Sequence, residues 1–387
     1  MQRLQQIYLD NSATTRPTQT VMDAVNRAMR KAWFNPSALY GPALTVEKQV
    51  DEVRKNVLHV LGADGHQLVF TACGTEADNL AILGHLKTRR DHGRVLIFSG
   101  EHPAVSACTA EIEHMGYHVE TIAAGPDGCV DLTKLEAQLS QDVQMLIVMQ
   151  VNNESGAIQP LKEVVALRDR HCPNAAIHVD GVQGFLRVPL AFSSLRIQSY
   201  ALSGHKVHAL KGIGALVFRK DHRISPIGYG GGQENGYRSG TENTPGILSL
   251  GAAVDSYPSD ASEAMMERKR QLYDGLKQAV PTLRLNGPAL DSPACAPHIL
   301  NVSLLPVRSQ TMLFALEGDG ILVSAGSACA SHKQKVSPVL SSMGLTTQEA
   351  DCALRFSLCP QTTQEEIAYT VERVRFQYDF LKNYTRR

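Results

Sequence analysis

Short runs of hydrophobic residues alternate with helical patterns along the first two thirds of the chain. The runs predict strands at residues 67–71, 94–98, 145–149, 176–180, 200–203 and 214–218. Because these runs are apolar on both faces and are mostly separated by helical stretches, they favour an α/β fold with a mostly parallel sheet covered by helices. The last two runs lie too close together for a helical crossover, so we expect an antiparallel neighbour there.

The pattern changes after about residue 255. Helical periodicity predicts helices at 264–280, near 310–317 and at 364–382, and apolar runs predict strands at 299–303 and 352–358. These elements indicate a smaller α+β domain at the C-terminal end. We therefore expect a large domain at residues 15–255 and a small domain formed by residues 1–14 and 256–387.

The composition argues against several classes of function. The formal net charge is zero, with 38 basic and 38 acidic residues, so nothing indicates a nucleic-acid or anionic-membrane partner. No apolar run approaches the roughly 18 residues of a membrane span, and no secretion signal precedes Ile7. We expect a cytoplasmic protein, whose neutral charge does not oppose association with a second copy.

The eight cysteines are irregularly spaced and form no CxxC pair, so we expect neither a disulfide scaffold nor a zinc site. Cys329 differs from the others. It lies in a run of small residues at 324–331, and basic residues follow it at positions 332, 333 and 335. Positive charge favours the thiolate, which indicates a reactive cysteine, although a buried inert thiol is the alternative.

Polar residues gather where the predicted strands end. The clusters occupy residues 71–76, 101–103, 152–154, 180–183 and 203–206. In open α/β sheets, ligands bind at the carboxyl ends of the strands. We therefore expect these five clusters to form one site.

One of these clusters is suited to binding a phosphate, and another contains a lysine that could react with the carbonyl group of a cofactor. Gly74 and Thr75 lie at a strand-to-helix junction, where backbone N–H groups suit a phosphate. Taken alone, this motif favours a helix cap at Thr75, with Asp78 as part of a capping box. Lys206 follows Ser203 and His205 and could form a Schiff base. A solvated lysine is the plain alternative for Lys206, and a second lysine five residues later is a rival.

Three further residues indicate a planar cofactor and an amino-acid substrate. Asp180 ends an apolar strand and needs a partner such as a pyridinium nitrogen, unless it caps a helix. His102, held extended by the proline that follows, could stack on a ring and shuttle protons, unless it only bonds the backbone. Arg355 alternates with apolar residues and could bind a substrate carboxylate, unless it forms an internal salt bridge.

Together these segments resemble the cysteine desulfurases of the NifS/IscS kind, in the class-V aminotransferase family of fold-type I enzymes that use pyridoxal 5'-phosphate (PLP). The resemblance covers nearly the whole chain and is carried by residues 8–15, 35–37, 70–79, 101–105, 151–156, 178–183, 203–206, 238–243 and 326–329. It implies a large domain with a mostly parallel seven-stranded sheet and a smaller C-terminal domain. The chain departs from the family's pattern at Phe34, Tyr40 and Ala43, near the mouth of the expected site.

The resemblance also implies a role for each site residue. Lys206 resembles the Schiff-base lysine and Asp180 the pyridinium partner, while His102 resembles the histidine that stacks on the ring and transfers protons. The implied phosphate contacts are Gly74, Thr75, Ser203, His205 and, from the partner subunit of a homodimer, Thr241. The positions implied near the ring hydroxyl or the substrate are Gln183, Asn153 and Arg355.

The implied reaction removes sulfur from L-cysteine and releases L-alanine. Cys329 resembles the nucleophile that takes the sulfur as a persulfide and passes it to an acceptor protein such as an iron–sulfur scaffold. If the chain holds a metal or cluster at all, Cys329 is the expected transient ligand. A selenocysteine lyase, another lyase or aminotransferase of this fold, and a non-catalytic sulfur carrier remain alternatives.

Overall fold

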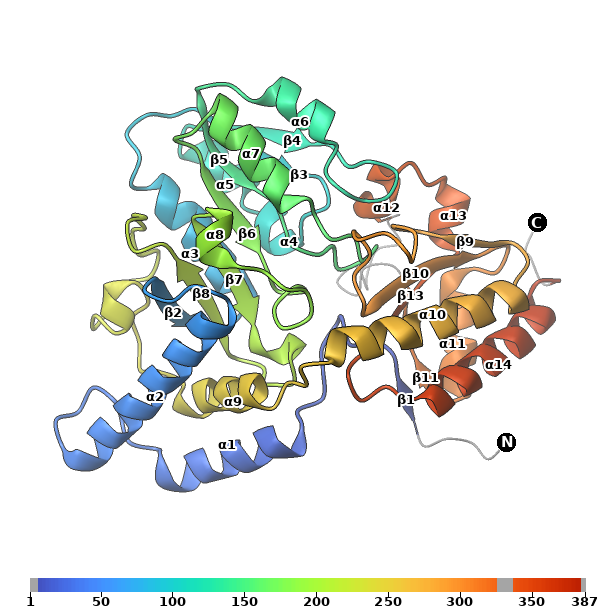
Figure 1. Ribbon diagram of the computed structural model, residues 1–387, viewed down its shortest axis with the longest axis horizontal. Helices are drawn as coiled ribbons and strands as arrows, with labels where there is room; N and C mark the ends of the chain where they lie inside the picture. Colours follow the sequence, from blue (N-terminus) through green and yellow to red (C-terminus); the bar gives the residue numbers. More distant parts are fainter. Residues whose placement is uncertain (1–5, 326–336, 384–387) are drawn as a thin grey trace.

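A seven-stranded sheet forms the centre of the large α/β part of the chain (Figure 1). The computed structural model describes residues 6–325 and 337–383. The strands follow the spatial order β2-β8-β7-β6-β5-β3-β4. Their bounds are β2 Gln67–Thr71, β3 Arg94–Phe98, β4 His118–Ile122, β5 Val143–Ile147, β6 Ala176–Asp180, β7 Ser199–Ser203 and β8 Gly214–Phe218.

The strand directions confirm the predicted mixed sheet. β8 runs antiparallel to both of its neighbours, β7 and β2, and the other pairs are parallel. The sequence pattern did not predict β4, because this edge strand buries only its last residue, Ile122, and therefore lacks a continuous apolar run. β5 begins and ends two residues earlier than the apolar run predicted.

Helices cover both faces of this sheet. On one face Ile82, Val105 and Ile112 pack against strand residues such as Val95 and Ile97. The helices of that face are α3 Gly74–Leu86, α4 Pro103–Ser106 and α5 Thr109–His114. The opposite face is covered by α6 Leu132–Gln138, α7 Leu161–His171 and α8 Phe192–Leu195, together with α2 Gly41–Val60 and α9 Thr244–Asp255.

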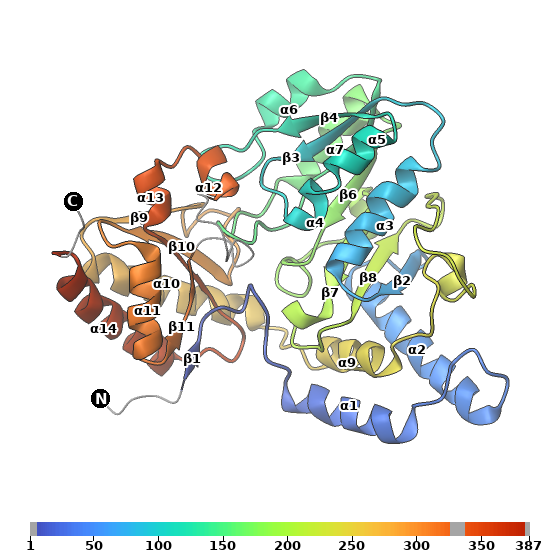
Figure 2. The ribbon, with the colours of Figure 1, turned by 180° about the vertical axis from the view of Figure 1, so that it is seen from behind.

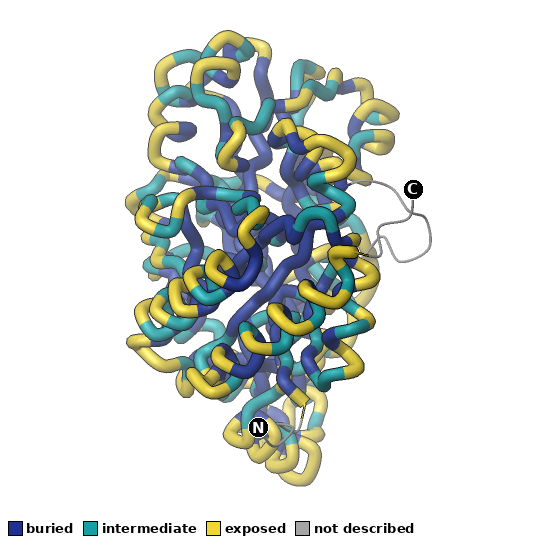
Figure 3. Tube along the Cα trace, turned by 90° about the vertical axis from the view of Figure 1, so that its right-hand side faces the viewer, coloured by how far each residue is buried: buried dark blue, intermediate teal, exposed yellow. Residues whose placement is uncertain are grey.

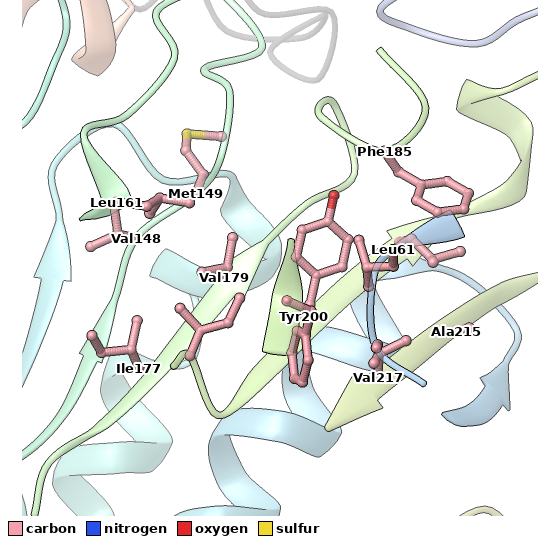
Figure 4. Close-up of a cluster of buried hydrophobic side chains, with 14 of the residues drawn as sticks. Leu61, Val148, Met149, Leu161, Ile177, Val179, Phe185, Tyr200, Ala215 and Val217 are labelled. Carbon is pink, nitrogen blue, oxygen red and sulfur yellow. The ribbon is translucent and has the colours of Figure 1, made fainter. Parts of the chain in front are cut away.

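The core of that second face is shown in Figure 4. Tyr200 lies among Val179, Ala215 and Val217, and its hydroxyl donates a hydrogen bond of 2.7 Å to Gln150 Oε1. Because strand side chains alternate between faces, burial on both faces explains why these strands are apolar throughout. Figure 3 shows the buried strands enclosed by exposed outer turns.

Three helices lie together at one end of the large part of the molecule (Figures 1 and 2). They are α1 Gln19–Lys31, α2 Gly41–Val60 and α9 Thr244–Asp255. α1 begins at its cap Thr18, whose side chain accepts from the Val21 N–H, and buries one stripe of small and branched residues. Two short 3₁₀ turns lie at Gly204–Lys206 and Glu234–Gly236.

A second, four-stranded antiparallel sheet has the order β12-β13-β10-β9. Its strands are β9 Leu283–Leu285, β10 Ile299–Leu304, β12 Ser324–Ala325 and β13 Ala353–Ser357. The helices of this region are α10 Ala261–Ala279, α11 Ser309–Gly318, α12 Pro338–Ser342, α13 Thr347–Asp351 and α14 Gln364–Leu381. No helix in the described ranges is long and apolar enough to cross a membrane.

The N-terminal arm packs with this second region. β1 Ile7–Tyr8 pairs in parallel with β11 Ile321–Leu322, and Ile7 and Leu9 belong to the same buried cluster as β10 and β13. The domain bounds 1–14, 15–255 and 256–387 stay a prediction.

Candidate active site

A cavity of about 440 Å³ lies at the carboxyl ends of the central strands and reaches the second sheet. Ten of the predicted site residues line it: Gly74, Thr75, His102, Asn153, Asp180, Gln183, Ser203, His205, Lys206 and Arg355. Pro338 and Val339 of α12 close one side. The five predicted clusters therefore meet in one place, as the strand-end argument expected.

Lys206 lies in the 3₁₀ turn that follows β7. Its Nζ donates hydrogen bonds of 2.6 Å to the carbonyl of Ser12 and 2.8 Å to the carbonyl of Ala13. Arg187 also donates to the Lys206 backbone carbonyl and so fixes the turn. Lys211, the rival, is exposed and does not line the cavity.

The region beside the start of α3 is suited to a phosphate. The cap residue Cys73 makes no side-chain hydrogen bond to the helix among the residues described, so the first backbone N–H groups remain for a ligand. The buried hydroxyl of Ser203 likewise has no hydrogen-bond partner within the described chain. A Cβ at Gly74 would lie 2.6 Å from Cγ2 of Val182, so a side chain at this position would displace a residue that also lines the cavity.

His205 completes this end of the cavity. Its Nδ1 lies 3.1 Å from Oγ1 of Thr14. Burial, with a smaller contribution from the charge of Lys206, lowers the pKa of His205 to about 4. The imidazole is therefore neutral at pH 7 and can donate one hydrogen bond without adding charge.

Asp180 lies at the end of β6 and is 4% exposed. Its Oδ1 accepts a 2.9 Å hydrogen bond from the Val182 N–H. Burial raises the pKa of Asp180, while that hydrogen bond and the nearby His102 and Lys206 oppose the rise. A buried carboxyl of this kind gains most from a cationic N–H placed in the cavity, which a pyridinium ring supplies.

His102 is fixed in one orientation. Its Nδ1 accepts a 3.1 Å hydrogen bond from the Ala104 N–H at the start of α4, so the neutral ring carries its proton on Nε2. Burial lowers the pKa of His102, and Lys206 lowers it further, against the opposing charge of Asp180. The ring is thus a neutral proton donor on the cavity wall.

Two buried acidic residues in the cavity, Asp78 and Glu101, were given no individual role from the sequence, although Glu101 belongs to the predicted 101–103 cluster. Oδ1 of Asp78 lies 3.1 Å from Nε2 of His178, so the interpretation of Thr75 and Asp78 as a capping box is wrong. Glu101 accepts from the Met149 N–H, and its other oxygen has no partner among the described residues. Burial raises the pKa of both carboxyl groups well above the usual range. The position of Glu101 directly before His102 was the only signal in the sequence.

Comparison with known proteins agrees with this geometry. Residues 7–369 match the family described as aminotransferase class-V. The chain belongs to this family. A cysteine desulfurase of Nostoc sp. (strain PCC 7120) is 36% identical over 95% of this chain and 91% of its own length. A solved NifS-like protein superposes with a TM-score of 0.90 at 30% identity, covering 97% of this chain and all of that one. A structure described as SspA in complex with cysteine has a TM-score of 0.80 at 28% identity, covering 92% and 99%.

Class-V aminotransferases use PLP, and the residues present here fit that cofactor. An uncapped helix start and the unpartnered hydroxyl of Ser203 suit its phosphate, while the buried Asp180 suits its ring nitrogen. Gln183 also lines the cavity. Its Nε2 donates to the Ser12 carbonyl and its Oε1 accepts from Arg187, both at 2.9 Å, which fixes the amide on the cavity wall.

Arg355 forms the internal salt bridge that was its alternative interpretation, and it also lines the cavity. One guanidinium nitrogen contacts Oδ1 of Asp10 and another contacts the Asn153 carbonyl, each at 2.8 Å. Its Nε is buried without a hydrogen-bond partner in the described ranges. The sequence did not indicate Asp10, because this residue is far away in the chain.

Four other positions named from the sequence have different outcomes. Thr241 lies outside the cavity of its own chain, in a separate hollow with Ala72. Cys329 lies outside the described residues. The departures Phe34 and Tyr40 lie near the start of α2 and do not line the cavity.

Replacing Gly74 with alanine is expected to weaken PLP binding by about 10-fold or more, because overpacking of this kind costs about 1–3 kcal/mol. The added methyl group would meet Val182 inside the hollow. PLP titration followed by visible absorbance measures the effect. Gly41→Ala is the matched control, since a Cβ there meets nothing within 4 Å. Equal affinities in the two variants would contradict the phosphate position.

Proposed function

We propose that this class-V aminotransferase is a cysteine desulfurase in which Lys206 holds PLP and Cys329 receives the sulfur. One observation carries the proposal. The cavity brings a lysine amine, a buried aspartate and an open helix start together with the guanidinium of Arg355. The first three suit PLP and the fourth suits an amino-acid carboxylate. Relatives that match nearly the whole chain are cysteine desulfurases.

PLP, when bound, draws electrons away from the substrate Cα. Lys206 is the residue that moves the α-proton, because it is the lysine that lines the described cavity. The carbonyls of Ser12 and Ala13 stabilise its ammonium form and so hold the proton between steps. Asp180 would hold the ring nitrogen of the cofactor in its protonated form, and His102 can donate a proton from Nε2.

Arg355 and Asn153 bind the substrate carboxylate in this proposal. The Arg355 guanidinium is already oriented by Asp10 and by the Asn153 carbonyl, so little side-chain entropy is lost on binding. Its unpartnered Nε marks the donor that a carboxylate would satisfy.

Cys329 attacks the sulfur of L-cysteine, and the carbon–sulfur bond of the substrate breaks. Cys329 keeps the sulfur as a persulfide, and L-alanine leaves after protonation. Residue 337, the first described after Cys329, is tied to the cavity wall: the Ser337 hydroxyl donates to Oε2 of buried Glu154 at 2.6 Å. The persulfide then passes to an acceptor protein. An iron–sulfur scaffold is our proposed acceptor, as the IscS name of several relatives suggests.

A homodimer completes the site in this proposal. Thr241 is exposed and outside its own cavity, which suits a phosphate contact given to the partner subunit. Large apolar side chains are also exposed beside α1 and α2, with Trp33 67% and Leu39 92% accessible. Such residues in one region are typical of a protein–protein interface.

Mass spectrometry after treatment with L-cysteine tests the function directly. We expect one extra sulfur atom on Cys329, release of alanine, and loss of both in Cys329→Ala. Cys73 is the alternative sulfur acceptor to be tested, because it is the cysteine that lines the described cavity. In Cys73→Ser the persulfide on Cys329 is expected to remain. Alanine formed equally fast by Cys329→Ala would overturn the persulfide mechanism.

Arg355→Lys is expected to raise KM for L-cysteine by about 10- to 100-fold, because lysine cannot hold Asp10, the Asn153 carbonyl and a carboxylate in one plane. We expect kcat to change less, since Arg355 does not move a proton. Steady-state kinetics with L-cysteine separates the two parameters. A fall in kcat at unchanged KM would place the substrate carboxylate elsewhere.

A further inference from the structure

A lysine and a cysteine outside the cavity lie in direct contact in the protein interior. Lys269 of α10 is 2% exposed and Cys295 is 4% exposed. Nζ of Lys269 lies 2.9 Å from Sγ of Cys295 and donates a 2.8 Å hydrogen bond to the Ala296 carbonyl. The proposed reaction uses neither side chain.

This buried lysine has an unusual environment. Among the residues described, no ion pair joins Lys269 to a carboxylate, and the thiol of Cys295 is the ionisable group that its Nζ contacts. Burial lowers the pKa of Lys269, and the contact with Cys295 opposes this. A lysine desolvated in this way releases its proton more readily and becomes a nucleophilic amine.

We propose that Lys269 and Cys295 form a redox-sensitive covalent bridge in which one oxygen atom joins Nζ to Sγ. The separation of 2.9 Å suits a single bridging atom with little movement of either side chain, whereas a direct nitrogen–sulfur bond requires a much closer approach. Cysteine sulfur readily enters oxidised states that condense with a neighbouring nucleophile.

The reaction balances with dioxygen as the oxidant. The neutral amine loses one hydrogen and the thiol loses its hydrogen. One oxygen atom becomes bonded to both nitrogen and sulfur, and the other leaves as water with the two hydrogens. Nitrogen and sulfur are oxidised and dioxygen is reduced. An excess of a dithiol reductant returns the amine, the thiol and water.

The bridge would connect α10 to a segment that borders the active site. Cys295 pairs with Ala157, and the Ala296 N–H donates to the Gly156 carbonyl at 2.9 Å. Gly156 and Ala157 lie two and three residues after Glu154, which lines the cavity. Oxidation would therefore link this segment of the cavity wall covalently to α10. The link would be separate from Cys329, which accepts the sulfur.

Peptide mass spectrometry of the holoenzyme tests the bridge. One sample is kept in air-saturated buffer and a second is kept under argon with dithiothreitol. We expect the aerated sample to contain a linked peptide pair joining Lys269 to Cys295, heavier by one oxygen and lighter by two hydrogens than the two free peptides. Dithiothreitol is expected to remove it.

Matched variants separate the bridge from general cysteine oxidation. Lys269→Arg keeps the charge and Cys295→Ser keeps the size, and both are expected to lose the linked peptide. Cys172→Ser, at another buried cysteine, is expected to retain it. Aerated wild-type protein with no linked peptide, or with oxygen on Cys295 alone, would overturn the proposal. A link that lacks the oxygen atom would overturn the bridge as drawn.

Discussion

Lys206→Ala is expected to reduce alanine formation from L-cysteine by about 10³-fold or more, because removing a positioned proton carrier costs about 10²–10⁴-fold. The loss has two causes. The variant has no amine to hold PLP covalently, and it has no group at this position to move the α-proton. The Ser12 and Ala13 carbonyls, which accept from Nζ, would face the cavity without their donor.

The control for this variant is Lys211→Ala, at the exposed lysine five residues later. It is expected to retain the visible absorbance of the bound cofactor and near-normal turnover. After borohydride reduction, PLP should remain attached to a Lys206 peptide in wild type and in Lys211→Ala. Cofactor attached to Lys211 instead would reverse the assignment.

Asp180→Asn is expected to lower turnover by about 10²–10³-fold. Breaking a buried charge pair costs about 3–5 kcal/mol, and each 1.36 kcal/mol is tenfold in rate. Asparagine has the same shape and can still accept from the Val182 N–H. It cannot hold the ring nitrogen protonated, so the electron-withdrawing power of the cofactor falls. Stopped-flow kinetics with L-cysteine measures the change.

The cofactor-free protein provides an independent check of this second prediction. Burial raises the pKa of Asp180 in the folded protein, so its carboxylate form opposes folding without PLP, increasingly as the pH rises above the ordinary range of aspartate. Asp180→Asn should therefore unfold at an equal or higher temperature than wild type without PLP at pH 8. With PLP the order should reverse. The same order in both states would argue that Asp180 has no cationic partner in the cofactor.

The central sheet was predictable because its strands are buried on both faces. The bounds of β2, β3, β6 and β8 agree with the apolar runs, since a strand covered by helices on each side has no polar face to interrupt the pattern. β4 was not predictable for the opposite reason, because its side chains are mostly accessible at the edge of the sheet.

The predicted site residues meet because the carboxyl ends of parallel strands share one edge. Their partners were not predictable. The acceptors of Lys206 are backbone carbonyls almost two hundred positions away in the chain. Every residue carries a backbone carbonyl, so the residue type does not indicate which one accepts. The pairs Asp10–Arg355 and Asp78–His178 join residues that are distant along the chain, and neither member signals the other.

The N-terminal arm has a practical consequence for protein engineering. From Ile7 onward it contacts both the large α/β part and the second region of the molecule. β1 pairs with β11, Asp10 forms an ion pair with Arg355, and the Ala13 carbonyl accepts a hydrogen bond from Lys206. A shortened protein that starts at α1 would keep the central sheet and lose part of the catalytic wall. Tags and fusion partners therefore belong ahead of Ile7, and circular permutants should not be opened between β1 and α1.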